Sequence, residues 1–112
     1  MKLLAVDTGK TKTFAVVVSD SLEVAGSRVA GPADVSLERE VVLKNLKSSV
    51  EGALRDAGIG LDDVDLIVIS WAGLDTRPDH ELARRYAEEV GLPMSKVVIE
   101  HDAVTAFYAV TW

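Results

Sequence analysis

The stretch that decides the fold is LLAVDTGKTKTFAVVV, at residues 3–18. Its two outer runs are short, apolar and rich in β-branched side chains, which is typical of buried strands. The segment between them, residues 7–13, contains one Asp, one Gly, two Lys and three Thr. We therefore predict strands at residues 2–7 and 13–19, joined by a hairpin loop rich in hydrogen-bond donors.

The residue types in this loop suit phosphate. Gly9 allows a close approach to a ligand that a Cβ atom would prevent, and Lys10 and Lys12 bring positive charge. Such a loop can bind phosphate through its backbone N–H groups, while Asp7 binds a magnesium ion and its coordinated waters. Residues 9–11 look like the end of a Walker A motif, but that motif needs an earlier Gly and a following helix, and both are missing here.

Composition limits the possible classes of protein. A chain of 112 residues with 48% hydrophobic and 27% charged residues can form one domain with its own core. The absence of Cys excludes disulfides, iron–sulfur clusters and thiol nucleophiles, and it fits a cytoplasmic protein. No apolar run reaches the length of a signal peptide or a membrane span. The net charge is −6 and the basic residues are dispersed among acids, so we expect no nucleic-acid partner.

The rest of the chain alternates strands and helices. We expect a strand at residues 22–30, a helix at 36–57, a strand at 65–70, a helix at 78–90, a strand at 96–100 and a last helix to residue 112. Ser36 is the expected N-cap of the first helix and Gly58 its stop, and residues 76–79 resemble a capping box. The order βββαβαβα predicts an antiparallel meander followed by parallel crossovers in one mixed α/β sheet.

The candidate site residues follow the strands that this topology makes parallel. Asp7 ends the first strand, Gly73 and Asp75 follow the fourth, and Asp102 follows the fifth. Ligands of open α/β sheets bind at this edge. Carboxylates beside a donor-rich loop suit phosphoryl transfer, which needs positioning, a metal and a base near the acceptor hydroxyl.

Three motifs in this order resemble a known family. Residues 7–13 are similar to the first phosphate motif of the actin/Hsp70/sugar-kinase ATPases. Residues 72–75 (Ala-Gly-Leu-Asp) and 101–103 (His-Asp-Ala) look like those of the BadF/BadG/BcrA/BcrD-type ATPases and N-acetylglucosamine kinases. The resemblance covers the whole chain. It implies a ribonuclease H-like fold with a five-stranded mixed sheet in the order 3-2-1-4-5 and helices on both faces, with residues 1–112 as the N-terminal ATPase domain.

The resemblance also implies roles for the loop and for the end of the fifth strand. Asp7 would hold magnesium, and Asp102 would be the base that takes a proton from a sugar hydroxyl. The implied contacts to the β- and γ-phosphates of ATP are Gly9, Thr11, Lys12 and Thr13. Lys10 stands where the family usually has a second Gly, so it either crowds the loop or adds a phosphate contact.

The acceptor side is less typical of the family. The loop at residues 31–34 and the loop at residues 73–75 would approach the sugar, through Asp34, Gly73 and Asp75. Asp34 stands near a position where sugar kinases of this type often carry Asn, and His101 stands where Asn is common. Simpler readings stay open: Asp7 caps the hairpin, Asp102 caps the last helix, and Asp75 is a turn residue.

Family members have two such domains, so the chain resembles half of an enzyme. We expect the N-terminal half of a sugar or amino-sugar kinase that uses ATP and Mg²⁺ and is nearly inactive alone. One alternative is the ATPase domain of a BadF-type activator, although such activators usually carry a cysteine-bound iron–sulfur cluster. Another is a non-catalytic interaction domain that keeps the fold.

The last ten residues carry no charge. A surface helix normally has a charged face, so we expect the helix at residues 103–112 to be covered on both sides. Its expected partners are the sheet and either a second domain or a second copy of the chain.

Overall fold

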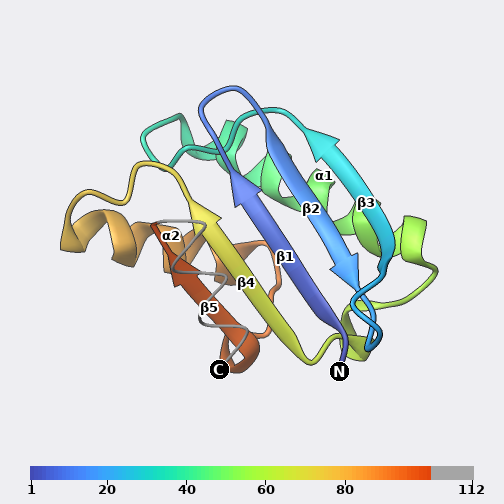
Figure 1. The fold of residues 1–112 in the computed structure, drawn as a ribbon. Helices are drawn as coiled ribbons and strands as arrows, with labels where there is room; N and C mark the ends of the chain where they lie inside the picture. Colours follow the sequence, from blue (N-terminus) through green and yellow to red (C-terminus); the bar gives the residue numbers. More distant parts are fainter. Residues whose placement is uncertain (102–112) are drawn as a thin grey trace.

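The computed structural model describes residues 1–101 (Figure 1). Its strands are β1 (Leu3–Thr8), β2 (Thr13–Val18), β3 (Val24–Ala30), β4 (Leu66–Trp71) and β5 (Val97–Glu100). Its helices are α1 (Arg39–Ala57) and α2 (Arg77–Glu89), with short 3-10 turns at Leu61–Asp63 and Met94–Lys96. Within this part of the chain, neither helix combines the length and apolar character needed to cross a membrane.

The five strands form one mixed sheet in the order β3-β2-β1-β4-β5. The pairs β1–β2 and β2–β3 are antiparallel, whereas β1–β4 and β4–β5 are parallel. This is the predicted meander followed by a crossover, and it confirms the ribonuclease H-like sheet. The last helix of the predicted order lies outside the described residues.

The core lies between the sheet and the two helices. Along β1 and β2, alternate residues are buried, and these include Leu4, Val6, Ala15 and Val17. The strand period of two puts these residues on one face of the sheet. Figure 1 shows α1 and α2 together on the far side of the sheet, where they cover this face. The prediction of a helix on the other face depends on residues 102–112, which lie outside the described part.

The first helix starts later than predicted. It begins at Arg39 with Glu38 as its N-cap, so Ser36 is not the cap. Ser36 instead donates its backbone N–H and its hydroxyl to Asp34 Oδ1, at 2.9 and 2.6 Å. This local turn satisfies the Ser36 donors outside the helix, which is the competition that moves Ser and Asp out of helix interiors. The predicted stop at Gly58 is confirmed, with a left-handed φ of 72°.

The second helix begins as its capping box predicts. Thr76 Oγ1 accepts from the Asp79 N–H, and the Asp79 carboxylate accepts from the Thr76 N–H. This cap fixes the point where the chain leaves the β4 loop. It therefore limits how far that loop can move.

The edge strand β3 packs very closely on α1. A Cβ atom on Gly26 would lie 2.4 Å from the Ala57 backbone nitrogen and 2.7 Å from the Ala53 carbonyl oxygen. Only glycine permits this approach. The strand begins at Val24, two residues later than predicted, because Ser19 and Glu23 close a turn through a 2.9 Å backbone hydrogen bond.

Candidate functional site

The carboxyl ends of β1, β4 and β5 lie at one edge of the sheet (Figure 1). The parallel register sets Asp7 beside Ser70, and Ser70 beside Glu100. The hairpin loop at residues 9–12 and the loop at residues 72–76 therefore leave the sheet as neighbours. This edge is where an open α/β sheet binds ligands.

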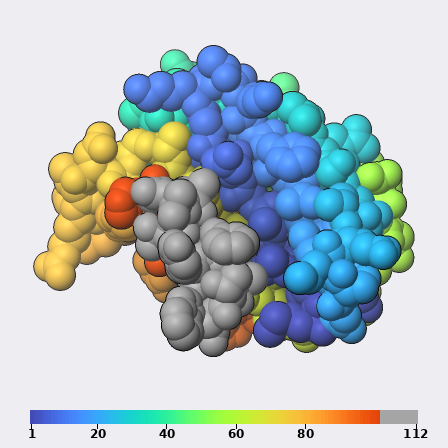
Figure 2. Space-filling view, viewed as in Figure 1, coloured from blue at the N-terminus to red at the C-terminus, as the bar shows by residue number. Residues whose placement is uncertain are grey.

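The hairpin loop is closed by one short backbone hydrogen bond, and its tip is open to solvent. The Gly9 N–H donates to the Lys12 carbonyl at 2.8 Å, and a Cβ on Gly9 would lie 3.1 Å from that oxygen. Lys10, Thr11 and Lys12 are all exposed. The loop projects at the upper edge of the molecule in Figure 2. Two ammonium groups and one hydroxyl thus stand in solvent on a tight turn, a donor set that fits phosphate.

The threonines that flank this loop point inward. Thr8 is 2% exposed, and its Oγ1 accepts from the Ala72 N–H at 3.1 Å. Thr13 is fully buried, and its Oγ1 has no hydrogen-bond partner among the described residues. Thr8 therefore ties the two loops together. The hydroxyl of Thr13 is enclosed by the protein, in contrast with the open hydroxyl expected of a phosphate ligand.

Asp7 is exposed at the end of β1. It alternates with the buried Val6 and Thr8, so its side chain lies on the face of the sheet away from α1. Within residues 1–101, its carboxylate makes no hydrogen bond or ion pair, and no three His, Asp or Glu side chains gather as a metal site. A single solvated carboxylate suits Mg²⁺, which keeps most of its waters and takes further oxygens from phosphate.

A third loop, residues 31–36, bridges the other two. The Ala33 N–H donates to the Gly9 carbonyl at 3.2 Å, and the Val35 N–H donates to the Ala72 carbonyl at 3.1 Å. The fully buried Trp71 donates from Nε1 to the Ala33 carbonyl at 2.7 Å. These bonds fix the predicted phosphate loop and the two predicted acceptor loops as one connected unit.

Among the charged site residues predicted within residues 1–101, Asp34 is the most enclosed. It is 2% exposed, and its Oδ1 accepts the two bonds from Ser36. Its Oδ2 is buried and has no partner among the described residues. A buried carboxylate oxygen without a donor is uncommon in folded proteins and calls for a reason.

Gly73 lies directly against this carboxylate. Its φ is 91°, and a Cβ atom there would stand 2.5 Å from Asp34 Oδ1 and 3.0 Å from Val35 Cγ1. Both the backbone conformation and the space require glycine. The structure thus brings together Asp34 and Gly73, two of the three residues predicted for the acceptor side.

The third, Asp75, is exposed and belongs to the entry of α2. Its N–H donates to the Asp79 carboxylate at 3.2 Å, and its own carboxylate makes no hydrogen bond within the described part of the chain. His101, the last described residue, is exposed. Asp102, the predicted base, lies outside the described residues.

Sequence reasoning missed the residues that position these loops. Asn45, on α1, donates from Nδ2 to the Pro32 carbonyl at 2.6 Å, and Trp71 holds Ala33 as described above. A polar amide next to the apolar stripe of α1 was the only signal for Asn45. No local pattern marks Trp71 as more than a packing residue, since its hydrogen bond spans 38 residues in the sequence.

The chain belongs to the BadF/BadG/BcrA/BcrD ATPase family, whose model matches residues 4–112. A search of the curated proteins found no match. The family assignment confirms the resemblance on which the motif roles were based.

Solved structures of sugar kinases share the fold. A putative N-acetylglucosamine kinase from Chromobacterium violaceum has a TM-score of 0.63 at 17% identity, covering 88% of this chain and 34% of that one. A ROK hexokinase from Thermus thermophilus has a TM-score of 0.64 at 28% identity, with coverage of 89% and 35%. A ROK glucokinase from Streptomyces griseus, in complex with glucose and AMPPNP, has a TM-score of 0.64 at 27% identity, with coverage of 92% and 34%. The chain thus spans about a third of the length of each neighbour.

Proposed function

We propose that this chain is the N-terminal phosphate-binding domain of an ATP-dependent phosphotransferase that acts on a sugar or an amino sugar. The observation that carries the proposal is the bonding of three loops at one sheet edge. The loop with the phosphate motif is held against the two acceptor loops through Gly9–Ala33, Thr8–Ala72 and Val35–Ala72. A domain that must align a phosphate with an acceptor needs such fixed relative positions.

On the phosphate side, the exposed loop supplies charge and donors. Lys10 and Lys12 would neutralise phosphate oxygens, and Thr11 would donate its hydroxyl. Gly9, whose N–H closes the turn on the Lys12 carbonyl, would let phosphate approach the loop because it has no Cβ atom. Asp7 would hold Mg²⁺ through water, and the metal when bound neutralises charge on the phosphates. Thr13 is too enclosed for direct contact, so its proposed part is to fix the end of the loop.

On the acceptor side, Asp34 and Gly73 would set the position of the sugar, with Asp75 at the rim. Asp34 Oδ2 is the free acceptor atom there, and reaching it would require the loops around it to part. Asp102 would take the proton from the acceptor hydroxyl, as the motif at residues 101–103 implies. The nucleotide base and the other side of the phosphates would be bound by a second domain.

Two measurements test the proposal, the first on the 112-residue chain. A titration with magnesium-ATP, followed residue by residue by ¹⁵N NMR, should give shifts at residues 7–13 with an affinity no better than roughly millimolar, about 4 kcal/mol. Lys10→Gln with Lys12→Gln should weaken it further, whereas Lys2→Gln, an exposed control, should not. Micromolar binding, or shifts that avoid residues 7–13, would contradict the proposal.

The second measurement uses a chain that also carries the second domain. Asp102→Asn removes the proposed base, and Asn is as good an N-cap residue as Asp, so phosphorylation of the sugar should fall by about 10²–10⁴ while ATP binding is retained. Asp62→Asn, an exposed acid in the 3-10 turn before β4, is the matched control and should keep full turnover. Full turnover in the Asp102 variant would exclude this residue as the base.

These measurements also separate the activator alternative. An ATPase that drives a partner would hydrolyse ATP without any sugar and would show no gain when sugars are added. A non-catalytic interaction domain would show neither activity in the longer chain.

A further inference from the structure

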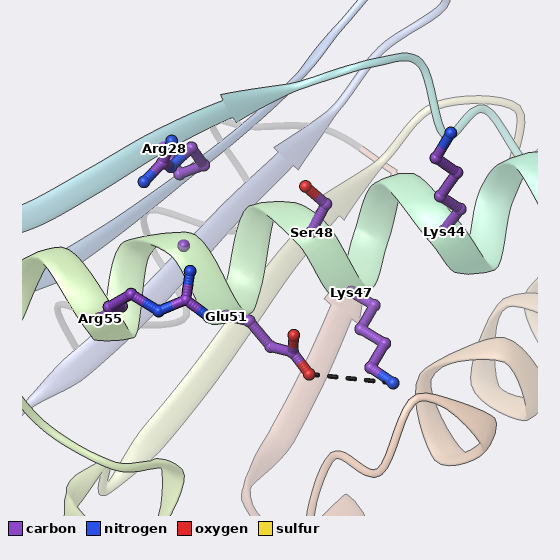
Figure 3. A pocket seen from close by; sticks show the side chains of 7 residues that line it. Arg28, Lys44, Lys47, Ser48, Glu51 and Arg55 are labelled. Atoms are coloured by element: carbon purple, nitrogen blue, oxygen red, sulfur yellow. Dashed lines mark ion pairs between the residues drawn. The ribbon is translucent and has the colours of Figure 1, made fainter.

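A hollow lies between α1 and β3, and none of the residues predicted for phosphate or acceptor binding lines it (Figure 3). Its volume is about 320 Å³. The lining consists of Arg28, Lys44, Lys47, Ser48, Glu51, Gly52 and Arg55. The six residues from α1 follow the 3–4 spacing of one helix face, and Arg28 reaches the hollow from β3.

The charge of this hollow is opposite to that of the chain. Four of its residues are cationic and one is acidic, in a chain with 12 Lys and Arg, 18 Asp and Glu, and a net charge of −6. The basic residues are dispersed along the sequence, as noted above, but the fold gathers a third of them here. An anion repelled by most of the surface would find a favourable potential at this place.

Within the described part of the chain, few carboxylates pair with these cations, so the cations can bind an added anion. Among residues 1–101, the only ion pair in the hollow joins Lys47 to Glu51 at 3.9 Å. Both side chains are more than half exposed, so the pair contributes little. Among residues 1–101, Arg28, Lys44 and Arg55 have no carboxylate oxygen within 4 Å. The nearby Asp56 accepts from the Ser27 backbone N–H at 2.9 Å.

Arg28 is seated on bare helix backbone. A Cβ atom on Gly52 would lie 2.5 Å from Arg28 Nε and 2.6 Å from Arg28 Cγ. Glycine in a helix interior is less favourable than alanine, and here the missing side chain makes room for the stem of Arg28. The stem of Arg28 therefore packs against α1 beside the hollow, while the residue as a whole stays exposed.

We propose that this hollow binds a small molecule with two or more phosphate charges. Two guanidinium groups can each grip phosphate oxygens with paired donors, and the lysines add point charges. The volume falls at the lower end of the range of small-ligand pockets, about 300–1,000 Å³. A nucleic acid would need a longer basic stripe than one helix face provides.

Inorganic pyrophosphate without magnesium is the probe, titrated into the 112-residue chain and followed by ¹⁵N NMR. Saturable shifts should centre on α1 and β3. Arg28→Gln with Arg55→Gln should weaken binding at least about tenfold, because each charge-assisted bond contributes substantially. Arg84→Gln with Arg85→Gln makes the same charge change on exposed positions of α2 and should leave the affinity within about twofold.

A second variant tests whether binding depends on the position of Arg28 or only on the overall positive charge of the hollow. Gly52→Ala keeps every charge but displaces Arg28, so affinity should fall about threefold or more. If Gly52→Ala does not fold, Ser48→Glu puts an acid into the hollow from an exposed position and should lower affinity at least about tenfold.

Four results would overturn the proposal. These are the absence of saturable binding, equal losses in the α2 control pair, unchanged affinity in the Gly52→Ala or Ser48→Glu variant, and shifts confined to residues 7–13. Lys10→Gln with Lys12→Gln should leave pyrophosphate binding at the hollow intact. The failure of this inference is therefore distinguishable from the failure of the proposed function.

Discussion

Two loops at the same sheet edge are built in opposite ways. The hairpin loop at residues 9–12 carries exposed Lys10, Thr11 and Lys12 and is closed by one backbone bond. At the junction of Asp34 with Gly73, the Asp34 carboxylate is buried and hydrogen-bonded, and no space is left between the two residues. The first presents its functional groups to solvent, and the second encloses them.

Because of this difference, we expect substitutions in the two regions to affect different properties: the stability of the fold in one and ligand binding in the other. Substitutions in the enclosed junction should lower the free energy of unfolding, since they break contacts that connect β4, the loop before α1 and the hairpin. Substitutions in the exposed loop should leave stability nearly unchanged and act on ligand affinity alone. The three predictions below test that contrast, from the largest expected effect on stability to the smallest.

Gly73→Ala should have the largest effect. Its φ of 91° strains any L side chain, and the new Cβ would meet Asp34 Oδ1 at 2.5 Å. We expect a loss of about 3 kcal/mol in the free energy of unfolding, measured by urea titration. Gly91→Ala is a matched control, because its φ is also 91° and nothing lies within 4 Å of its Cβ position. That variant should lose only the backbone strain, about 1 kcal/mol. Equal losses would show that the Asp34 contact carries no weight.

Asp34→Ala should have an intermediate effect. It removes the acceptor of both Ser36 donors and leaves space inside the junction, so we expect a loss of about 2 kcal/mol. Asp34→Asn keeps an oxygen in the Oδ1 position and can donate from the other side, so it should lose about 1 kcal/mol or less. Asp56→Ala is the exposed counterpart, because it removes a carboxylate that accepts one backbone bond. If the Asp56 variant lost as much stability as the Asp34→Ala variant, the buried junction would not be special.

Local patterns in the sequence predicted most of the fold. Three of these patterns are the alternating burial in β1 and β2, the capping box at Thr76 and the stop at Gly58. Each depends on residues only a few positions apart, so the local sequence is enough to predict it. The predicted start of α1 was wrong because two local hydrogen-bonding arrangements compete there. Ser36 can cap a helix or bind Asp34, and the tertiary contact of Asp34 with Gly73 favours the second.

The site was predictable in its location but not in its construction. The motif residues fall where parallel strands end, which is a rule of topology. The hydrogen bonds that join the loops connect distant positions: Trp71 and Ala33 are 38 residues apart, and Thr8 and Ala72 are 64 residues apart. No periodicity encodes such pairs. The burial of Thr13 is likewise a property of the packed sheet, and the role of Asp102 stays a prediction.

Lys10→Gln combined with Lys12→Gln should have the smallest effect on stability. Both side chains are exposed, and within residues 1–101 neither has a hydrogen bond or ion pair, so the free energy of unfolding should change by less than about 0.5 kcal/mol. Removing two positive charges from a chain of net charge −6 leaves it more acidic, and the added repulsion should lower stability only slightly. Urea titration of the double variant beside Gly73→Ala measures the contrast directly. A loss above about 1 kcal/mol would mean that the hairpin loop is held by its lysines, and the distinction between an enclosed and an open half of this edge would fail.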